Sequence, residues 1–185
     1  MKNLLFVLCL LFLISCKSTQ NKYSKIKKFT PLDKEEISKR MNGYSIAIPE
    51  NWYSYIESHG LFWQSPKKLK QNGIIYYANH FSVEIEKIEE GKNLDNIYNE
   101  KEERLNKVYK DFSRTKNLYN NKIYGDYFVI KYRVNWNMIN YTVSEVIYLY
   151  KGKSYTLKYS SWDKYYSKYL PDVIKMIESF KIIEK

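Results

Sequence analysis

The chain has 185 residues, enough for one globular domain, and its 44% hydrophobic and 17% aromatic residues supply material for a sizeable core. Its 31 Lys and Arg against 20 Asp and Glu give a formal charge of +11, while only 6 Gly and 4 Pro argue against long disordered stretches. Both Cys lie within the first 16 residues and there are only 2 His, which excludes a disulfide framework and a Cys/His zinc cluster from the body.

The positive charge does not indicate a nucleic-acid-binding protein. Lys outnumbers Arg by 27 to 4, whereas base and phosphate recognition favours the forked guanidinium of Arg. Lys, Asn, Ile and Tyr, whose codons are rich in A and T, together make up 82 residues, so coding bias explains part of the excess. Residues 29–185 carry 25 basic and 20 acidic groups, and the folded body is therefore expected to be only mildly basic.

The first 16 residues have the pattern of a secretory signal that ends in a lipidation site. A charged start precedes an 11-residue apolar run over residues 4–14, shorter than the roughly 20 residues that a membrane-spanning helix needs. Leu13-Ile14-Ser15-Cys16 resembles a bacterial lipobox, which implies cleavage before Cys16 and lipidation of its sulfur and new amino group. We predict a lipoprotein signal peptide over residues 1–15. The alternative is an ordinary secreted protein in which Cys16 is incidental.

Residues 16–30 are interpreted as the lipidated cysteine and a flexible basic tether. The stretch 17–28 is polar, contains five Lys and no acid, and could either lie against anionic headgroups or be fully solvated. Lys17, not Asp, follows the cysteine, which by resemblance to Gram-negative sorting favours the outer membrane. We therefore expect a protein held in the cell envelope by the lipid on Cys16, in the outer membrane and facing the periplasm.

Residues 31–185 are expected to form a single domain that opens with a short helix and several strands. Thr30-Pro31 predicts an N-cap and a first turn for a helix that runs to about Lys39. Period-two alternation then predicts strands over residues 44–48, 61–64 and 74–88. The first strand ends at a turn at Pro49, and a lysine-rich loop over residues 67–73 joins the other two.

A long amphipathic helix, three strands and a second long helix follow. Asn93 is the predicted N-cap of the first helix, and the apolar residues of this helix recur as far as Phe112. Its cationic side is expected to consist of Arg104, Lys107, Lys110, Arg114 and Lys116. Lys151-Gly152 indicates a tight hairpin within the strands 124–134, 139–150 and 153–161. The second helix is expected from about Asp163 to Phe180 with Pro171 inside it, and residues 181–183 could add a closing edge strand. This order predicts an α+β domain with an antiparallel sheet.

Two segments resemble those of PsbP-like and DcrB-like domains. Residues 43–52 read Gly-Tyr-Ser-Ile-Ala-Ile-Pro-Glu-Asn-Trp and are similar to the opening strand of these domains. Residues 154–160, with the helix that ends at Phe180, are similar to their closing strand and helix. The resemblance spans about residues 43–183 and implies an α/β/α sandwich around a central antiparallel sheet, often secreted or lipid-anchored in bacteria. Its motifs are structural, so it implies no catalytic residue and no cofactor.

Polar and aromatic side chains on the three predicted strands mark a possible binding face. Hydroxyls, aromatic rings and cations on one face could stack on and hydrogen-bond a partner protein or a glycan. If a helix covers this face, the same residues belong to the core. The residues proposed for contact are Tyr127, Lys131, Arg133, Tyr148 and Lys158, in a face that also includes Val129, Thr142, Ser144, Val146, Ser154, Thr156 and Ser160.

Two other groups of residues fit structural roles better than functional ones. His80, Glu84 and Glu86 share a strand face, but residues i and i+4 on a strand lie about 13 Å apart, so His80 and Glu84 cannot share one metal ion without help from another strand. Trp136 and Trp162 could form a ligand-binding rim, although packing at a hairpin or helix start is the commoner role. No metal site is predicted.

No catalytic motif is visible in the sequence. Cys16 is expected to carry lipid, no Gly-x-Ser-x-Gly elbow occurs, and neither His59 nor His80 has a recognisable serine or acid partner. We expect a non-catalytic, lipid-anchored envelope protein that binds another envelope protein or component. A small-molecule or glycan carrier is the alternative, and a hydrolase whose carboxylate pair meets only in space is a third possibility.

Overall fold

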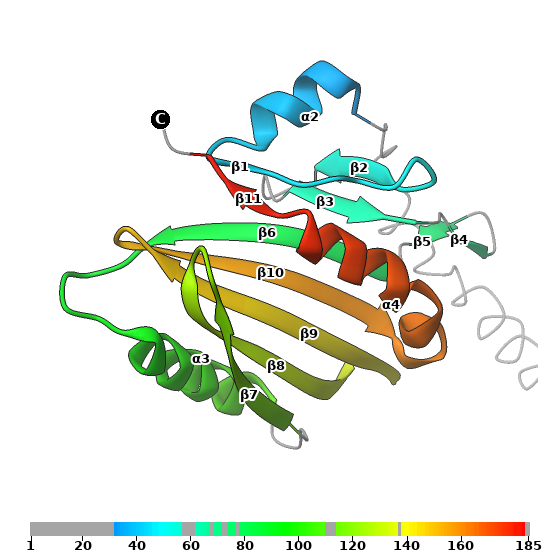
Figure 1. Cartoon of the computed structure of the whole chain (residues 1–185). Coiled ribbons are helices and arrows are strands. Elements are labelled where there is room, and N and C mark those ends of the chain that lie inside the picture. Colours follow the sequence, from blue (N-terminus) through cyan, green and yellow to red (C-terminus); the bar gives the residue numbers. More distant parts are fainter. Residues whose placement is uncertain are drawn as a thin grey trace, which may run out of the picture.

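The computed structural model describes residues 32–56, 62–66, 69–71, 74–76, 78–109, 114–136 and 138–183. They form a seven-stranded antiparallel sheet with one long helix on each face and a short helix beside one end (Figure 1). The predicted α+β class is confirmed. No described helix is long and apolar enough to cross a membrane. The signal peptide over residues 1–15, the tether over residues 16–30 and the lipidation of Cys16 lie outside the described residues and stay predictions.

The main sheet has the strand order β2-β3-β6-β10-β9-β8-β7. Its centre is a meander in which β8 (Gly125–Trp136), β9 (Ile139–Tyr150) and β10 (Lys153–Trp162) pair antiparallel in turn, as predicted. On one side the sheet continues with β6 (Asn79–Lys87), β3 (Phe62–Ser65) and β2 (Tyr53–Ile56). On the other side it ends with β7 (Arg114–Asn121). The sequence pattern predicts no strand over β2 or β7.

Two small sheets complete the strands. β1 (Tyr44–Ser45) pairs with β11 (Lys181–Ile182), so the predicted closing strand exists, but it joins β1 and not the edge of the main sheet. β4 (Leu69–Gln71) pairs with β5 (Ile74–Tyr76) where the sequence predicted a loop followed by the start of a long strand.

The turn between β9 and β10 determines which side chains share a face. Lys151 and Gly152 have φ values of 46° and 70°, as a two-residue hairpin turn requires, and the turn pairs Tyr150 with Lys153. Tyr148 therefore lies opposite Tyr155, three residues away from Lys158. Because side chains alternate along a strand, Tyr148 and Lys158 lie on opposite faces of the sheet.

One face of the sheet is covered by α4 (Asp163–Glu178). The helix buries Tyr166, Val173 and Met176, and Phe180 follows it into the same core. Pro171 lies inside α4, which continues past it as one helix. The sheet residues of this core are Phe81, Val146, Tyr148, Tyr155, Leu157 and Tyr159.

The opposite face is covered by α3 (Leu94–Val108). Asn93 is its N-cap, as predicted, and Asn93 and Asn96 form a capping box in which each side chain accepts from the other residue's backbone N–H. Tyr98 packs with Phe128, Ile130 and Ile147 of the sheet. The helix ends at Val108, so the assignment of Arg114 and Lys116 to its last turns is wrong: both residues lie on β7.

The short helix α2 (Lys34–Arg40) stands apart from these layers. Its N-cap is Asp33, whose side chain accepts from the Glu36 N–H, so the predicted start at Thr30 is three residues too early. No residue of α2 is buried.

Candidate functional site

The face of the sheet that carries α4 is only partly covered. α4 packs chiefly on β6, β9 and β10 and leaves the same side of β7 and β8 accessible (Figure 1). Pairing of the two strands makes this surface continuous, since Thr115 lies beside Lys131 and Tyr119 beside Tyr127. We call it the open face, and it consists of Thr115, Asn117, Tyr119, Tyr127, Val129, Lys131 and Arg133.

The structure brings together four of the five residues predicted to form a binding face. Tyr127, Lys131 and Arg133 lie on the open face, and Tyr148 lies on the same side of the sheet beside Tyr127. Lys158 lies on the α3 side, together with Ser154, Thr156 and Ser160, so the predicted common face is wrong for β10. Tyr148 is only 5% exposed, which makes it part of the core beneath the surface.

A row of aromatic rings connects the open face to the core under α4. The Tyr119 ring is 47% exposed and stacks on Tyr127 with centroids 5.6 Å apart. Tyr127 contacts Tyr148 at 4.9 Å, and Tyr148 stacks on Phe180 at 5.8 Å. Burial raises the pKa of Tyr148 to about 12, so its phenol is neutral at physiological pH. The buried end of the row fixes the position of the exposed rings, which lowers the entropy lost on binding.

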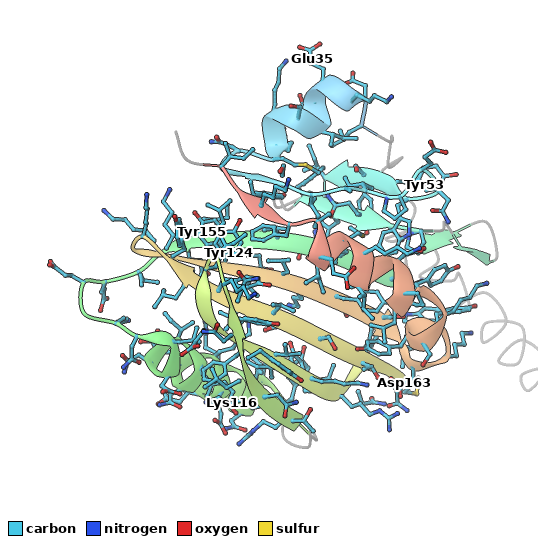
Figure 2. All side chains as sticks on the ribbon, in the orientation of Figure 1. Glu35, Tyr53, Lys116, Tyr124, Tyr155 and Asp163 are labelled. Carbon is cyan, nitrogen blue, oxygen red and sulfur yellow. The ribbon has the colours of Figure 1, made fainter. Side chains whose placement is uncertain are left out.

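The other end of the open face is cationic. Lys131 and Arg133 are exposed, with Lys131 Nζ 4.7 Å from the centroid of the Tyr166 ring. Arg133 Nε lies 3.6 Å from Asp163 Oδ2, at the start of α4 (Figure 2). This end of the open face therefore has two cations and one carboxylate, and its net positive charge suits an acidic partner.

β7 forms the edge of the sheet beside the open face. Residues 114–120 are exposed, and among the described residues β7 pairs with β8 alone. An edge strand of eight residues presents backbone N–H and C=O groups on its outer side, which can accept an added strand. The surface can thus offer backbone pairing at its rim together with stacking and ionic contacts on its face.

The side chains on the other side of β7 fasten the strand to α3. Arg114 forms an ion pair with Glu102 of the helix, and Lys116 Nζ lies 3.1 Å from Asp95 Oδ1 (Figure 2). The Lys116 ammonium also lies 3.8 Å from the ring centroids of both Tyr98 and Phe128. These contacts hold β7 in place while its edge and its α4-side surface stay exposed.

A buried carboxylate lies on the α3 side of the sheet. Glu145 is 0% exposed, accepts a hydrogen bond of 2.8 Å from the Tyr132 hydroxyl and forms an ion pair with Lys101 of α3. Lys158 Nζ lies 3.9 Å from the same carboxylate, a neighbour that the sequence pattern does not predict. Burial and the negative charge of Glu145 raise the pKa of Tyr132. The ion pair of Lys101 with Glu145 links α3 to the sheet. A cavity of about 140 Å³ adjoins these residues.

His80 and Trp162 have local packing partners. His80 Nδ1 is 2.6 Å from the Tyr55 hydroxyl, and its ring meets Trp63 edge-on at 4.9 Å. No group of His, Cys, Asp and Glu that could hold a metal occurs in the described part of the chain. Trp162 donates from Nε1 to the Tyr141 hydroxyl at 2.9 Å, as expected for packing at the start of a helix.

Comparison with known proteins agrees with this architecture. The sequence pattern of the PsbP family matches residues 35–182. The structure is similar to PsbP (CyanoP) from Synechocystis sp. PCC 6803, with 16% identity over 76% of this chain and 87% of that chain, and a TM-score of 0.52. No match was found among curated proteins.

Two further solved structures share the fold. LpqN of Mycobacterium tuberculosis, described as involved in cell envelope biogenesis, is 10% identical over 76% of this chain and 83% of its own, with a TM-score of 0.59. A protein of Bacteroides thetaiotaomicron VPI-5482 is 14% identical over 77% of this chain and 46% of its own, with a TM-score of 0.52. The family match covers most of the chain and the same fold recurs in these structures: the chain belongs to the PsbP family.

Proposed function

We propose that this protein is a lipid-anchored, non-catalytic component of the cell envelope that binds an extended, acidic segment of another envelope protein. The segment pairs with the outer edge of β7 and lays its side chains on the open face. The observation that carries the proposal is the exposure of a regular eight-residue edge strand beside an uncovered aromatic and cationic surface.

The backbone of β7 supports strand addition in preference to a contact through side chains alone. An added antiparallel strand would continue the ladder that already joins Asn117 to Val129 and Tyr119 to Tyr127. Main-chain pairing supplies affinity and alternate side chains supply specificity in this binding mode. Every second residue of the added strand would face the same side as Tyr119 and Lys131, where stacking and an ion pair are available.

The charge of the open face supports an acidic partner. Lys131 and Arg133 outnumber the one nearby carboxylate, Asp163, and Lys122 is exposed in the turn that joins β7 to β8. Complementary charge of this kind raises the association rate and excludes basic partners more than it increases the final affinity.

The envelope location rests on the lipidation predicted at Cys16. The fifteen residues 16–30 could reach about 50 Å from the membrane if fully extended, which would keep the domain near the bilayer and its proteins. The similarity to LpqN, a protein involved in cell envelope biogenesis, supports the same setting. Lys17, which follows the cysteine, favours an outer-membrane position facing the periplasm.

Photo-crosslinking in intact cells tests the proposed surface. A photoreactive residue at Asn117, on β7, should capture a discrete envelope protein, whereas the same residue at Lys168, an exposed position on α4, should not. Lys131→Glu should lower the yield at Asn117 by about threefold or more, because it opposes an acidic segment, and Lys168→Glu should leave it unchanged. Equal capture at both positions, or a crosslinking yield at Asn117 that Lys131→Glu does not change, would contradict the proposal.

A carrier of small molecules is the second candidate function. The observation that favours it is a groove beneath α2, far along the chain from the open face, whose size is typical of ligand sites.

A further inference from the structure

A groove of about 950 Å³ lies beneath α2, at the end of the molecule where α2, β1 and β11 meet (Figure 1). Its volume falls within the roughly 300–1,000 Å³ that ligand pockets occupy. The walls come from α2, β1, the segment that follows β1 and the residue after β11. Lys39, Asn42 and Glu50 are among the polar residues that line them, beside several apolar side chains. The apolar side chains include Ile37, Met41, Ile46, Ile48, Trp52 and Ile183.

α2 bridges this groove and is attached to the body on both sides. Before the helix, the Leu32 N–H donates to the Ser54 carbonyl at 3.0 Å, and beyond it the Ile183 N–H donates to the Gly43 carbonyl at 3.0 Å. Between these bonds no residue of α2 is buried. The inner side of the helix, with Ile37, therefore faces the groove and is not packed into a core.

The two ends of the groove differ in polarity. Ser54 lines the groove where α2 begins, is only 3% exposed, and its hydroxyl has no hydrogen-bond partner among the described residues. A buried hydroxyl without a partner is unfavourable, which points to a ligand atom that would accept from it. Lys34, in the first turn of α2, lines the same end. Met41 and Ile183 supply apolar surface at the far end, beside Asn42.

We infer that this groove binds a long-chain fatty acid. Its carboxylate accepts a hydrogen bond from the Ser54 hydroxyl and pairs with the Lys34 ammonium, and its acyl chain runs beneath α2 toward Ile183. A carboxylate satisfies both polar groups at once, whereas a neutral apolar ligand would leave the buried hydroxyl without a partner. One extended chain can contact the apolar side chains of the groove, and its single carboxylate requires a cation such as Lys34 at one end. The inference is independent of the surface proposed on β7 and β8.

Quenching of Trp52 fluorescence measures this binding, because Trp52 lines the groove. The full chain, held in an amphipathic polymer, is titrated with dibromostearic acid, whose bromine atoms quench tryptophan on contact. The Trp52→Phe chain supplies the signal of the remaining tryptophans. The methyl ester of the same acid tests the carboxylate, because an ester resembles an acyl chain attached to protein or lipid and carries no charge.

The decisive comparison uses two isoleucines of equal exposure. Ile183 in the groove is 46% exposed and Ile174 on α4 is 45% exposed, so neither substitution empties a core. Ile183→Asp should weaken binding about tenfold or more and Ile174→Asp less than about twofold, because only the first puts a charge beside the acyl chain. Ser54→Ala combined with Lys34→Ala should weaken the acid about tenfold and should reduce its preference over the ester. Quenching that does not saturate, equal effects of the two aspartates, or equal binding of acid and ester would overturn the inference.

Discussion

The ion pair between Lys101 and Glu145 should contribute more to stability than any surface pair of the protein that the structure describes. Glu145 is wholly buried and Lys101 has 15% of its side chain exposed, so Lys101→Met leaves a buried carboxylate with the Tyr132 hydroxyl and the more distant Lys158 as neighbours. Removing one partner of a buried pair costs about 3–5 kcal/mol, and Lys158 at 3.9 Å places the expected cost near the lower figure, about 3 kcal/mol.

Urea unfolding of the full chain measures this cost. With a slope of about 2 kcal/mol per molar urea, Lys101→Met should lower the midpoint by about 1.5 M. Lys39→Met is the control, because the Lys39–Glu35 pair is 65% and 79% exposed and should contribute less than about 0.5 kcal/mol.

The double variant separates loss of the pair from loss of packing. Adding Glu145→Gln to Lys101→Met removes the uncompensated charge and should return the free energy of unfolding to within about 1 kcal/mol of the wild type. The reasoning is refuted if Lys101→Met costs no more than Lys39→Met, or if the double variant is as unstable as Lys101→Met.

Three other predictions concern the anchor, the aromatic row and the β9–β10 turn. Cys16→Ala should move the chain from the membrane to the soluble fraction, and continued membrane association after a carbonate wash would contradict lipid anchoring. Burial raises the pKa of Tyr148 to about 12, so the unfolded chain releases this proton first and stability falls as pH rises from about 10 toward 12. Tyr148→Phe should remove this residue's share of the fall in urea midpoints, to which other buried tyrosines such as Tyr44 also contribute, and an unchanged fall would count against it. Gly152→Ala should lower the free energy of unfolding by about 1 kcal/mol through its φ of 70° alone, since no atom outside Gly152 and its two chain neighbours lies within 4 Å of the added Cβ. A loss above about 3 kcal/mol would contradict this.

The register of the central meander could have been read from the sequence. A two-residue turn at Lys151-Gly152 pairs Tyr150 with Lys153 and therefore places Tyr155, not Lys158, on the face of Tyr148. A common face for Tyr148 and Lys158 is incompatible with this turn. Glu145 also had a signal, because it interrupts the otherwise apolar row of Val143 and Ile147 that faces α3.

Other features had no local signal in the sequence. β7 is exposed on both faces, so it lacks the alternation that marks a half-buried strand, and its basic residues were assigned to the preceding helix. The open face depends on how far α4 extends across the sheet. The groove beneath α2 depends on contacts between segments far apart in the chain, such as that of Ile183 with Gly43. The open face and the groove depend on how helices and strands pack, which the hydrophobic periodicity of the sequence does not predict.

Hydrogen–deuterium exchange on the complex with the captured envelope protein tests the central claim most directly. Amides of β7, residues 114–121, should become protected on binding, because an added strand gives the outward-facing N–H groups acceptors. Amides of α2 and of the β9–β10 turn should exchange as they do in the free chain. Unchanged exchange across β7, with protection at α2 or α4 instead, would contradict the account.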